Sequence, residues 1–219
     1  MKSRIFSTDR FGEIAKRAKD LLNAHEDFLS ASTVRSTRAA GDAIQSILEE
    51  NLKGIVGEDC AEYSVNFARR AMADMAFTDG DGLYYVTDVK THRKETKFNM
   101  PNLTSVERLA RFYEDDSNYF VMLLVKYSLK GIHATISEVT FIPIEFLDWD
   151  CLTVGALGWG QIQIANSNNV RVRPHYSRKK WVLELCDAML EFYPKEIGKI
   201  HTRVGYFEKV KRHWQTKPK

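Results

Sequence analysis

The chain has 219 residues, of which 44% are hydrophobic, so it can bury a core, and a wholly disordered tail is excluded. No segment approaches the roughly 18 consecutive apolar residues that a membrane helix needs. Residues 1–17 are charged and lack the apolar stretch of a signal peptide. We therefore expect a soluble, cytoplasmic protein that has no membrane partner.

The cysteines and the charges narrow the possible classes of protein further. Cys60, Cys151 and Cys186 are far apart and belong to no Cys-x-x-Cys pair, which argues against a disulfide framework and a zinc site. The net charge of +3 is uneven: residues 171–219 hold thirteen Lys or Arg and five Asp or Glu, a net +8, and the remainder is −5. This pattern suits a nuclease, since phosphates need cations and metal sites need carboxylates. A solubilising helical tail would give the same pattern.

Apolar spacing predicts the elements in chain order. Helical spacing covers residues 11–29 and 41–55, after which the period changes to that of strands. We expect strands over 73–77 and 83–92 joined by a turn over 78–82, since Asp-Gly pairs supply the positive φ of a hairpin. The remaining expected elements are a helix over 105–113, strands over 119–127, 132–144 and 161–164, a helix from Ser177 and a helix over 204–214. This order predicts a single α/β domain, with a mixed β-sheet flanked by helices.

Three charged residues are expected to converge in the hairpin. Successive side chains of a strand point to opposite faces, so Asp88 and Lys90 share one face. A turn centred on Gly80 would set Asp74 opposite Val86, which makes Asp74 the diagonal neighbour of Asp88, roughly 7–8 Å away at the backbone. Two carboxylates and one ammonium group would then meet on the same face.

Such a cluster suits metal-assisted hydrolysis of a phosphodiester bond. Mg²⁺ prefers one or two carboxylates and keeps several waters, so Asp74 and Asp88 could hold it beside a scissile phosphate. Lys90 would either orient the attacking water as a base or stabilise the pentacovalent phosphorane, and the sequence leaves both roles open. A solvated strand edge is the structural alternative, since Glu95-Thr96-Lys97 repeats the acidic-x-Lys pattern with no apolar strand around it.

Several segments are similar, in the same order, to one group of enzymes. Residues 38–42 (Arg-Ala-Ala-Gly-Asp) resemble an Ala-Ala-Gly-acid helix start, residues 88–91 (Asp-Val-Lys-Thr) an Asp-Val-Lys motif, and residues 100–105 (Met-Pro-Asn-Leu-Thr-Ser) a Pro-Asn-Ile-(Thr/Ile)-Ser stretch. Residues 156–164 are close to Ala-Leu-Gly-Thr-Gly-Gln-Ile-Gln-Ile, and residues 177–181 parallel a Thr-x-x-x-Trp helix start. Together these pieces resemble the PD-(D/E)xK nuclease superfamily, and more narrowly its type II restriction endonucleases of the HincII/HpaI-like group.

The resemblance implies a restriction-endonuclease-like fold and a type II site-specific deoxyribonuclease. Such an enzyme is a homodimer that uses Mg²⁺ to hydrolyse phosphodiester bonds of double-stranded DNA at a short palindrome, here leaving blunt ends. The resemblance also implies a bacterial or archaeal cell and a restriction-modification system, in which a cognate DNA methyltransferase acts on the same site. Residue by residue, Asp74, Asp88 and Lys90 match the catalytic acid, acid and lysine, and the two aspartates match metal ligands.

DNA contacts and an organisation of the chain are implied in the same way. Asn99 and Asn102 fall where the group has a DNA-contacting Gln and a base-contacting Asn, and positively charged side chains would contact phosphates. The chain 1–219 would comprise an N-terminal helix and DNA-contacting or dimer arm (1–38), a catalytic core (39–195) and a basic C-terminal helix (196–219). The full set of expected DNA-binding residues is Arg35, Arg38, Arg93, Lys94, Asn99, Asn102, Ala156, Leu157, Gly158, Trp159 and Gln161.

Three points stay open at the level of the sequence. The gap between the two aspartates is one residue longer than in the resembling group, and unless the turn absorbs the difference, Asp79 or Asp81 would compete as the first acid. Asp42, at a helix start, could be a further acid or only a helix cap. The function could also be that of a non-specific or repair nuclease of the same superfamily, or of a noncatalytic, sequence-specific DNA-binding protein.

Overall fold

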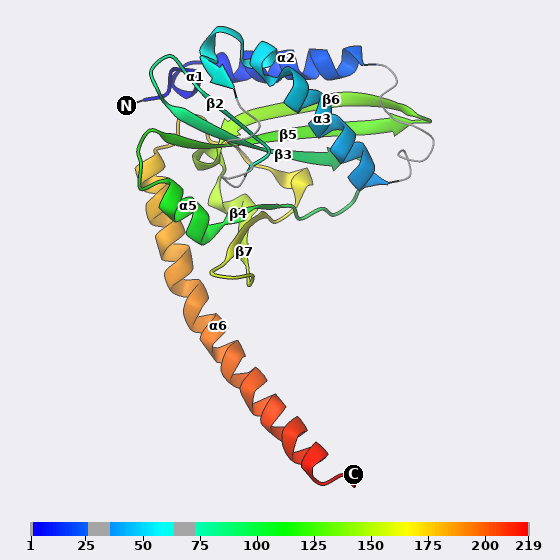
Figure 1. Ribbon diagram of the computed structural model, residues 1–219, viewed down its shortest axis with the longest axis vertical. Coiled ribbons are helices and arrows are strands. Elements are labelled where there is room, and N and C mark those ends of the chain that lie inside the picture. The colour runs from blue at the N-terminus through cyan, green and yellow to red at the C-terminus, as the bar shows by residue number, and fades with distance from the viewer. Residues whose placement is uncertain (1, 26–35, 64–72, 219) are drawn as a thin grey trace. The chain divides into compact units, whose positions relative to one another are not determined.

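The computed structural model describes residues 2–25, 36–63 and 73–218. The chain divides into two compact units, Met1–His175 and Tyr176–Lys219 (Figure 1). Across the described residues, no helix combines the length and the apolar character required to cross a membrane.

A five-stranded sheet forms the centre of the first unit. Its order is β1 (Glu62–Tyr63), β2 (Met75–Thr78), β3 (Tyr84–Arg93), β5 (Asn118–Lys130) and β6 (His133–Pro143). The pair β3 and β5 is parallel, and the other neighbours are antiparallel. Residues 119–125 of β5 are all buried, as expected for a central strand covered on both faces. The predicted α/β fold with a mixed sheet is confirmed.

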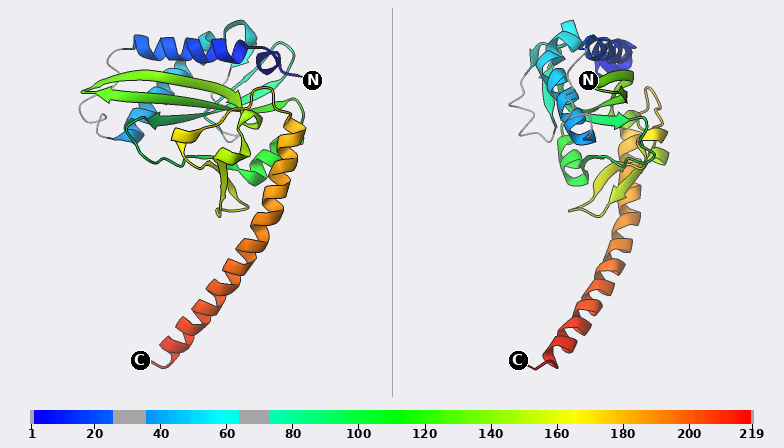
Figure 2. Two further views of the ribbon diagram at one scale, coloured as in Figure 1. Left: turned by 180° about the vertical axis from the view of Figure 1, so that it is seen from behind. Right: turned by 90° about the vertical axis from the view of Figure 1, so that its right-hand side faces the viewer.

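Two helices cover one face of this sheet (Figures 1 and 2). The helix α2 (Arg10–Ala24) packs on β6 and on α3 (Thr37–Val56), and α3 packs on β3. Their sequences explain this packing, because each carries fully buried apolar residues four positions apart, one helical turn. In α3 these residues are Ala40, Ile44, Leu48 and Leu52.

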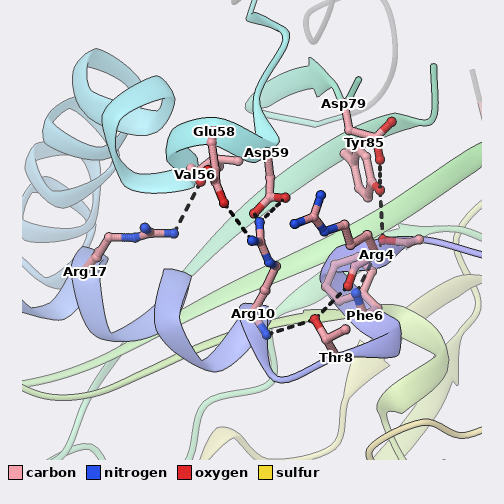
Figure 3. A network of polar contacts seen from close by, with 11 residues as sticks. Arg4, Phe6, Thr8, Arg10, Arg17, Val56, Glu58, Asp59, Asp79 and Tyr85 are labelled. Carbon is pink, nitrogen blue, oxygen red and sulfur yellow. Dashed lines mark hydrogen bonds and ion pairs between the residues drawn. The ribbon is translucent and has the colours of Figure 1, made fainter. Parts of the chain in front are cut away.

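A short helix and an ion-pair network attach the start of the chain to this layer. The helix α1 (Arg4–Ser7) is capped by the Ser3 hydroxyl, which accepts a hydrogen bond from the Phe6 amide. Arg10 of α2 holds both carboxylate oxygens of Asp59, at 2.5 and 2.6 Å, and one of Glu58, at 2.6 Å (Figure 3). Because Glu58 and Asp59 directly follow α3, this bidentate pair fixes the end of one helix to the start of the other.

A second, three-stranded sheet has the order β4 (Asn102–Ser105), β8 (Gln161–Ile164) and β7 (Leu152–Gly155). The helix α5 (Val106–Phe112) directly follows β4. Of these strands, only β8 was predicted, because its polar and apolar residues alternate. In β4, Leu103 is the one apolar residue, so no alternation is seen, and in β7 the alternation covers only Leu152, Thr153 and Val154. Among the described residues, the unit also has 3-10 turns at Gly57–Asp59, Ile144–Phe146, Trp149–Cys151 and Ser167–Asn169.

The second unit is dominated by one helix, α6 (Arg178–Gln215), whose 38 residues are continuous (Figure 1). The prediction of two separate helices here was wrong, and the expected boundary at residues 195 and 196 lies inside α6. Pro194 occupies an exposed position within the helix without ending it. Helical spacing continues beyond it through Ile197, Ile200 and Val204, which the sequence analysis did not take into account.

The closest approach between α3 and β3 occurs at Gly41. A Cβ atom at this position would lie 2.7 Å from Oγ1 of Thr91, a β-branched side chain that has little freedom to move away. We therefore expect Gly41→Ala to lower the free energy of unfolding by about 1–3 kcal/mol through overpacking. Urea denaturation would measure the loss. Combining Gly41→Ala with Thr91→Ala should recover part of it, and equal stability of Gly41→Ala and the wild type would contradict this packing.

Candidate active site

The hairpin of β2 and β3 sets the relative positions of the charged residues. Met75 pairs with Thr87 and Thr78 with Tyr84, so the predicted register was wrong by two residues. The connection has five residues, 79–83, as many as the predicted turn over 78–82, but it is centred on Asp81 and not on Gly80. The observed register, continued by one residue, sets Asp74 directly across from Asp88 and not diagonal to it.

The structure brings Asp74, Asp88 and Lys90 together. Oδ2 of Asp74 accepts a hydrogen bond of 2.7 Å from the backbone amide of Val89, the residue between Asp88 and Lys90. Nζ of Lys90 donates to Oδ1 of Asp88 at 2.8 Å. Asp88 is 6% exposed, and among the described residues its Oδ2 has no hydrogen-bond partner. The cluster therefore holds one buried carboxylate oxygen that is free to accept a further ligand.

Burial and neighbouring charges set the electrostatics of this cluster. Burial raises the pKa of Asp88 from its ordinary 3.8 to about 7, the nearby charge of Asp74 adds to the rise, and Lys90 opposes it. A carboxylate that is buried close to a second carboxylate disfavours its own charged form. A bound cation would relieve this repulsion between the two carboxylates. An ion pair on a solvated strand does not create such a repulsion.

The second acidic-x-Lys segment shows the contrast. Glu95 lies 48% exposed beyond the end of β3 and pairs with Arg93, and Lys97 is also exposed. Glu95 and Lys97 thus belong to a solvated surface. The alternative interpretation as a solvated strand edge fits this segment and does not fit Asp88 and Lys90, which lie inside the central sheet.

Asp42 is not brought to this cluster. It is exposed on α3, and α3 approaches β3 at Thr91. Since side chains alternate along a strand, Thr91 points to the opposite face of the sheet from Asp88 and Lys90. The N-cap of α3 is Ser36, whose hydroxyl accepts from the Ala39 amide, so Asp42 is not the capping residue either.

The residues present fit a magnesium ion better than a transition metal. In the described ranges, no three His, Cys, Asp or Glu side chains gather into a closed metal cage. The donors on offer are oxygens of two carboxylates, including the unpartnered Oδ2 of Asp88. Mg²⁺ is typically held by one or two carboxylates together with waters and substrate phosphate oxygens, so Asp74 and Asp88 are a sufficient set of protein ligands.

Asp79 and Asp81, the competing first acids, lie in the loop at the other end of β2. Oδ1 of Asp79 accepts from the amides of Asp81 and Leu83, at 3.0 and 2.9 Å, and Oδ2 accepts from the Tyr85 hydroxyl at 2.7 Å. Both carboxylate oxygens are therefore used in closing the loop, and Figure 3 shows the bond with the Tyr85 hydroxyl. Asp81 is exposed. Asp79 is a structural residue, and it explains why the loop is longer than a two-residue turn.

Replacing Asp79 distinguishes a structural role in the loop from a role as the first catalytic acid. Asp79→Ala removes three hydrogen bonds and leaves the Leu83 amide without its side-chain acceptor, so we expect a loss of about 2–4 kcal/mol in the free energy of unfolding. Any cleavage activity per folded molecule should be retained at 20 °C. Chemical denaturation and a DNA digest of the same sample would measure both. A stable but inactive Asp79→Ala variant would make Asp79 the first catalytic acid.

The expected base-reading residues gather on the three-stranded sheet. Asn102 of β4 pairs in register with Gln163 of β8, and Nε2 of Gln163 donates to Oδ1 of Asn102 at 2.6 Å. The loop 156–160 joins β7 to β8, and in it Ala156, Gly158, Leu157 and Trp159 are exposed, the last two by 67% and 58%. Gln161 begins β8. An exposed amide pair beside an exposed loop can present donors and acceptors to an extended partner.

Two adjacent residues that the sequence did not indicate, Ser167 and Asn168, connect this region to β3. Ser167 donates its amide to the Asn99 carbonyl at 2.8 Å, and Nδ2 of Asn99 donates to the Ser167 hydroxyl at 3.4 Å. Oδ1 of Asn168 lies 2.9 Å from Nε2 of His92, and its Nδ2 donates to the carbonyls of Thr96 and Lys97. Nothing in the sequence links residues 76 positions apart. His92 is buried.

The expected phosphate contacts within the described residues lie on α3 and at the end of β3. Arg38 is exposed on α3, and Lys94 is exposed just beyond β3. Nε of Arg93 donates to Glu95 at 3.0 Å. Arg35 lies outside the described residues. These residues provide accessible positive charges, but their positions do not define a path for DNA.

Comparisons with known proteins add no assignment. No model of a known protein family matches the chain, and no curated protein sequence matches it.

Proposed function

We propose that this chain is a Mg²⁺-dependent deoxyribonuclease that cleaves double-stranded DNA. The observation that carries the proposal is the cluster of Asp74, Asp88 and Lys90, in which a buried carboxylate has a free oxygen beside a lysine ammonium group. The sequence resemblance to type II restriction endonucleases supports the same three residues as catalytic acid, acid and lysine.

Each side chain has a chemical task in this proposal. Asp74 is oriented by the Val89 amide, and Asp88 by Lys90, so two carboxylates are fixed for ligation before substrate arrives. Bound Mg²⁺ would supply a water of lowered pKa and positive charge for the phosphate oxygens. The ammonium group of Lys90 is ion-paired, and this favours electrostatic stabilisation of the phosphorane over a role as base.

Sequence specificity belongs to the proposal as well. Asn102, Gln163 and the loop 156–160 offer exposed amide and backbone groups, which suit readout of base edges in a groove. A palindromic site and blunt ends follow from the resemblance, as do a homodimer, because a two-fold site matches a two-fold protein, and a cognate methyltransferase. A bacterial or archaeal restriction-modification system is the proposed setting.

Digestion of plasmids of known sequence tests this function. Full-length protein is incubated with DNA in Mg²⁺ and, separately, in a chelator, and the fragment ends are sequenced. We expect discrete fragments in Mg²⁺ alone, all sharing one short palindrome at their ends. A smear would indicate a non-specific or repair nuclease, and intact DNA that is nevertheless bound would indicate a noncatalytic DNA-binding protein. Either outcome would overturn the proposal of a restriction endonuclease.

A further inference from the structure

An apolar strip with a seven-residue period runs along α6. One series recurs every seven positions at Leu183, Leu190, Ile197, Val204 and Lys211. A second series follows the first by three positions, at Cys186, Tyr193, Ile200, Phe207 and Trp214. We call the two series together the α6 strip. All the members of the strip are exposed, among them Leu190 by 72% and Phe207 by 67%.

The alternating spacing of three and four is the repeat of a coiled coil. Apolar residues at the first and fourth positions of a heptad form a seam that faces a partner helix, and in α6 Ile197 and Val204 occupy first positions and Ile200 and Phe207 fourth positions. An ordinary helix on a globular core carries a broader apolar stripe and buries it. The α6 strip is narrow and exposed, and its seven-residue period is that of a seam packed against a second helix.

The helix needs such a partner for its own stability. Pro194, Gly198 and Gly205 lie within α6, and each disfavours a helix in isolation. Helices derive most of their stability from packing of an apolar face. From Leu190 to Trp214, the α6 strip is an exposed apolar face that is available for this packing.

The surface of α6 already has the shape that receives a partner side chain. A shallow hollow is lined by Ile200, Arg203, Val204, Phe207, Glu208 and Lys211. In a parallel pair of helices, each seam residue inserts between four residues of the other helix. Ile200, Arg203, Val204 and Phe207 are the four that receive the Val204 side chain of a second copy. The last four lining residues, Val204, Phe207, Glu208 and Lys211, receive its Phe207 side chain.

The charges beside the strip identify the partner as a second copy in parallel register. Arg203 precedes a first-position residue and Glu208 follows a fourth-position residue, and in a parallel, in-register pair these two positions meet across the seam. Opposite charges therefore face each other on both sides of the dimer. Lys211, the one charged member of the strip, would meet its own copy, and a polar first-position residue of this kind fixes register at a cost in stability.

We propose that α6 forms a parallel, two-stranded coiled coil with α6 of a second copy of this chain. The proposal rests on the second unit alone and does not depend on the cleavage chemistry. A parallel arrangement joins both Met1–His175 units to the same end of the coil. Two such units at one end suit a duplex with two equivalent strands, whereas an antiparallel coil would join them to opposite ends.

Sedimentation equilibrium of the full chain tests whether the α6 strip is a dimer interface. We expect a mass of twice 25.2 kDa for the wild type. Val204→Glu should weaken dimerisation by about 100-fold or more, because two carboxylates would enter the apolar seam. The matched control Thr202→Glu lies on the outer side of the helix and should remain dimeric. Circular dichroism would show that both variants stay folded. A wild-type monomer, or a Val204→Glu variant that dimerises as the wild type does, would overturn the proposal.

Exchanging the charges of Arg203 and Glu208 tests whether the two α6 helices pair in parallel. Arg203→Glu alone sets two carboxylates against each other on both sides of a parallel dimer, so we expect about a tenfold loss of dimer affinity. Adding Glu208→Arg to the same chain should restore it. Cysteines introduced by Val204→Cys, with Cys186→Ser, should also cross-link between copies on oxidation, whereas Thr202→Cys should not. Failure of both the rescue and the cross-link would indicate an antiparallel pair or another partner helix, and would refute the parallel dimer even if DNA is cleaved as proposed.

Discussion

Asp88→Asn is expected to reduce Mg²⁺-dependent DNA cleavage by at least about 10³-fold while leaving DNA binding in Ca²⁺ intact. The substitution keeps the shape of the side chain and removes the charge that would hold the metal ion. Single-turnover cleavage and gel-shift binding with the same DNA would measure the two effects. Cleavage at the wild-type rate would remove Asp88 from the mechanism.

The same substitution should stabilise the metal-free protein, which a merely structural carboxylate would not do. Burial raises the pKa of Asp88 in the folded state to about 7, above its ordinary 3.8. The folded protein therefore binds the proton more tightly than the unfolded chain, and stability is lost as the pH rises from about 4 to about 7. At pH 8, in chelator, we expect Asp88→Asn to be more stable than the wild type by about 1 kcal/mol or more.

Urea denaturation at pH 8 and pH 5 would measure this difference, which should shrink at the lower pH as Asp88 becomes neutral. The matched control is Glu95→Gln, which changes the acid of the exposed acidic-x-Lys segment. It should leave both cleavage and stability close to the wild type, because surface ion pairs contribute little. An Asp88→Asn variant that is less stable than the wild type at pH 8 would show that the ion pair with Lys90 holds the fold together.

Lys90→Met is expected to lower the cleavage rate by about 10²–10⁴-fold, because the cluster loses the cation beside the reacting phosphate. The aliphatic stem is retained, so packing should change little. Metal binding by Asp74 and Asp88 should persist, since neither carboxylate is altered. Single-turnover rates at saturating protein and Mg²⁺ would measure the loss in the chemical step.

Two further variants, Lys97→Met and Lys90→Arg, test the role of Lys90. Lys97→Met, in the exposed segment, should cleave as the wild type does. Lys90→Arg retains a positive charge that does not dissociate at neutral pH, so it separates the two roles of the lysine. Partial activity of Lys90→Arg would support electrostatic stabilisation, whereas inactivity equal to that of Lys90→Met would support a base. Unchanged cleavage by Lys90→Met would contradict both roles.

The sequence predicted the elements that have a clear period. The strand over 83–92 and the helix over 41–55 correspond closely to β3 and α3, because apolar alternation and four-residue spacing fix each of them locally. The convergence of Asp74 with Asp88 and Lys90 was also predicted, since it depends only on which face each side chain takes.

The features that the sequence did not predict depend on contacts between distant residues. The hairpin register was wrong because the loop is centred one residue later than expected, where the Asp79 carboxylate bonds to Leu83 and Tyr85, and this bonding has no local signature. The contact of His92 with Asn168 joins segments that no periodicity relates. In α6, two helices were expected where one continuous helix contains Pro194, and the spacing of the apolar residues after Pro194 is the signal that indicates continuity.

Binding of Mn²⁺, observed by electron paramagnetic resonance at pH 8, tests most directly whether Asp74 and Asp88 form one divalent-ion site. Full-length wild type, Asp74→Asn and Asp88→Asn would be titrated, with Mg²⁺ as the competitor. We expect the wild type to bind Mn²⁺ that Mg²⁺ displaces, and each variant to lose that binding while remaining folded. Undiminished Mn²⁺ binding by both variants would contradict the proposed site.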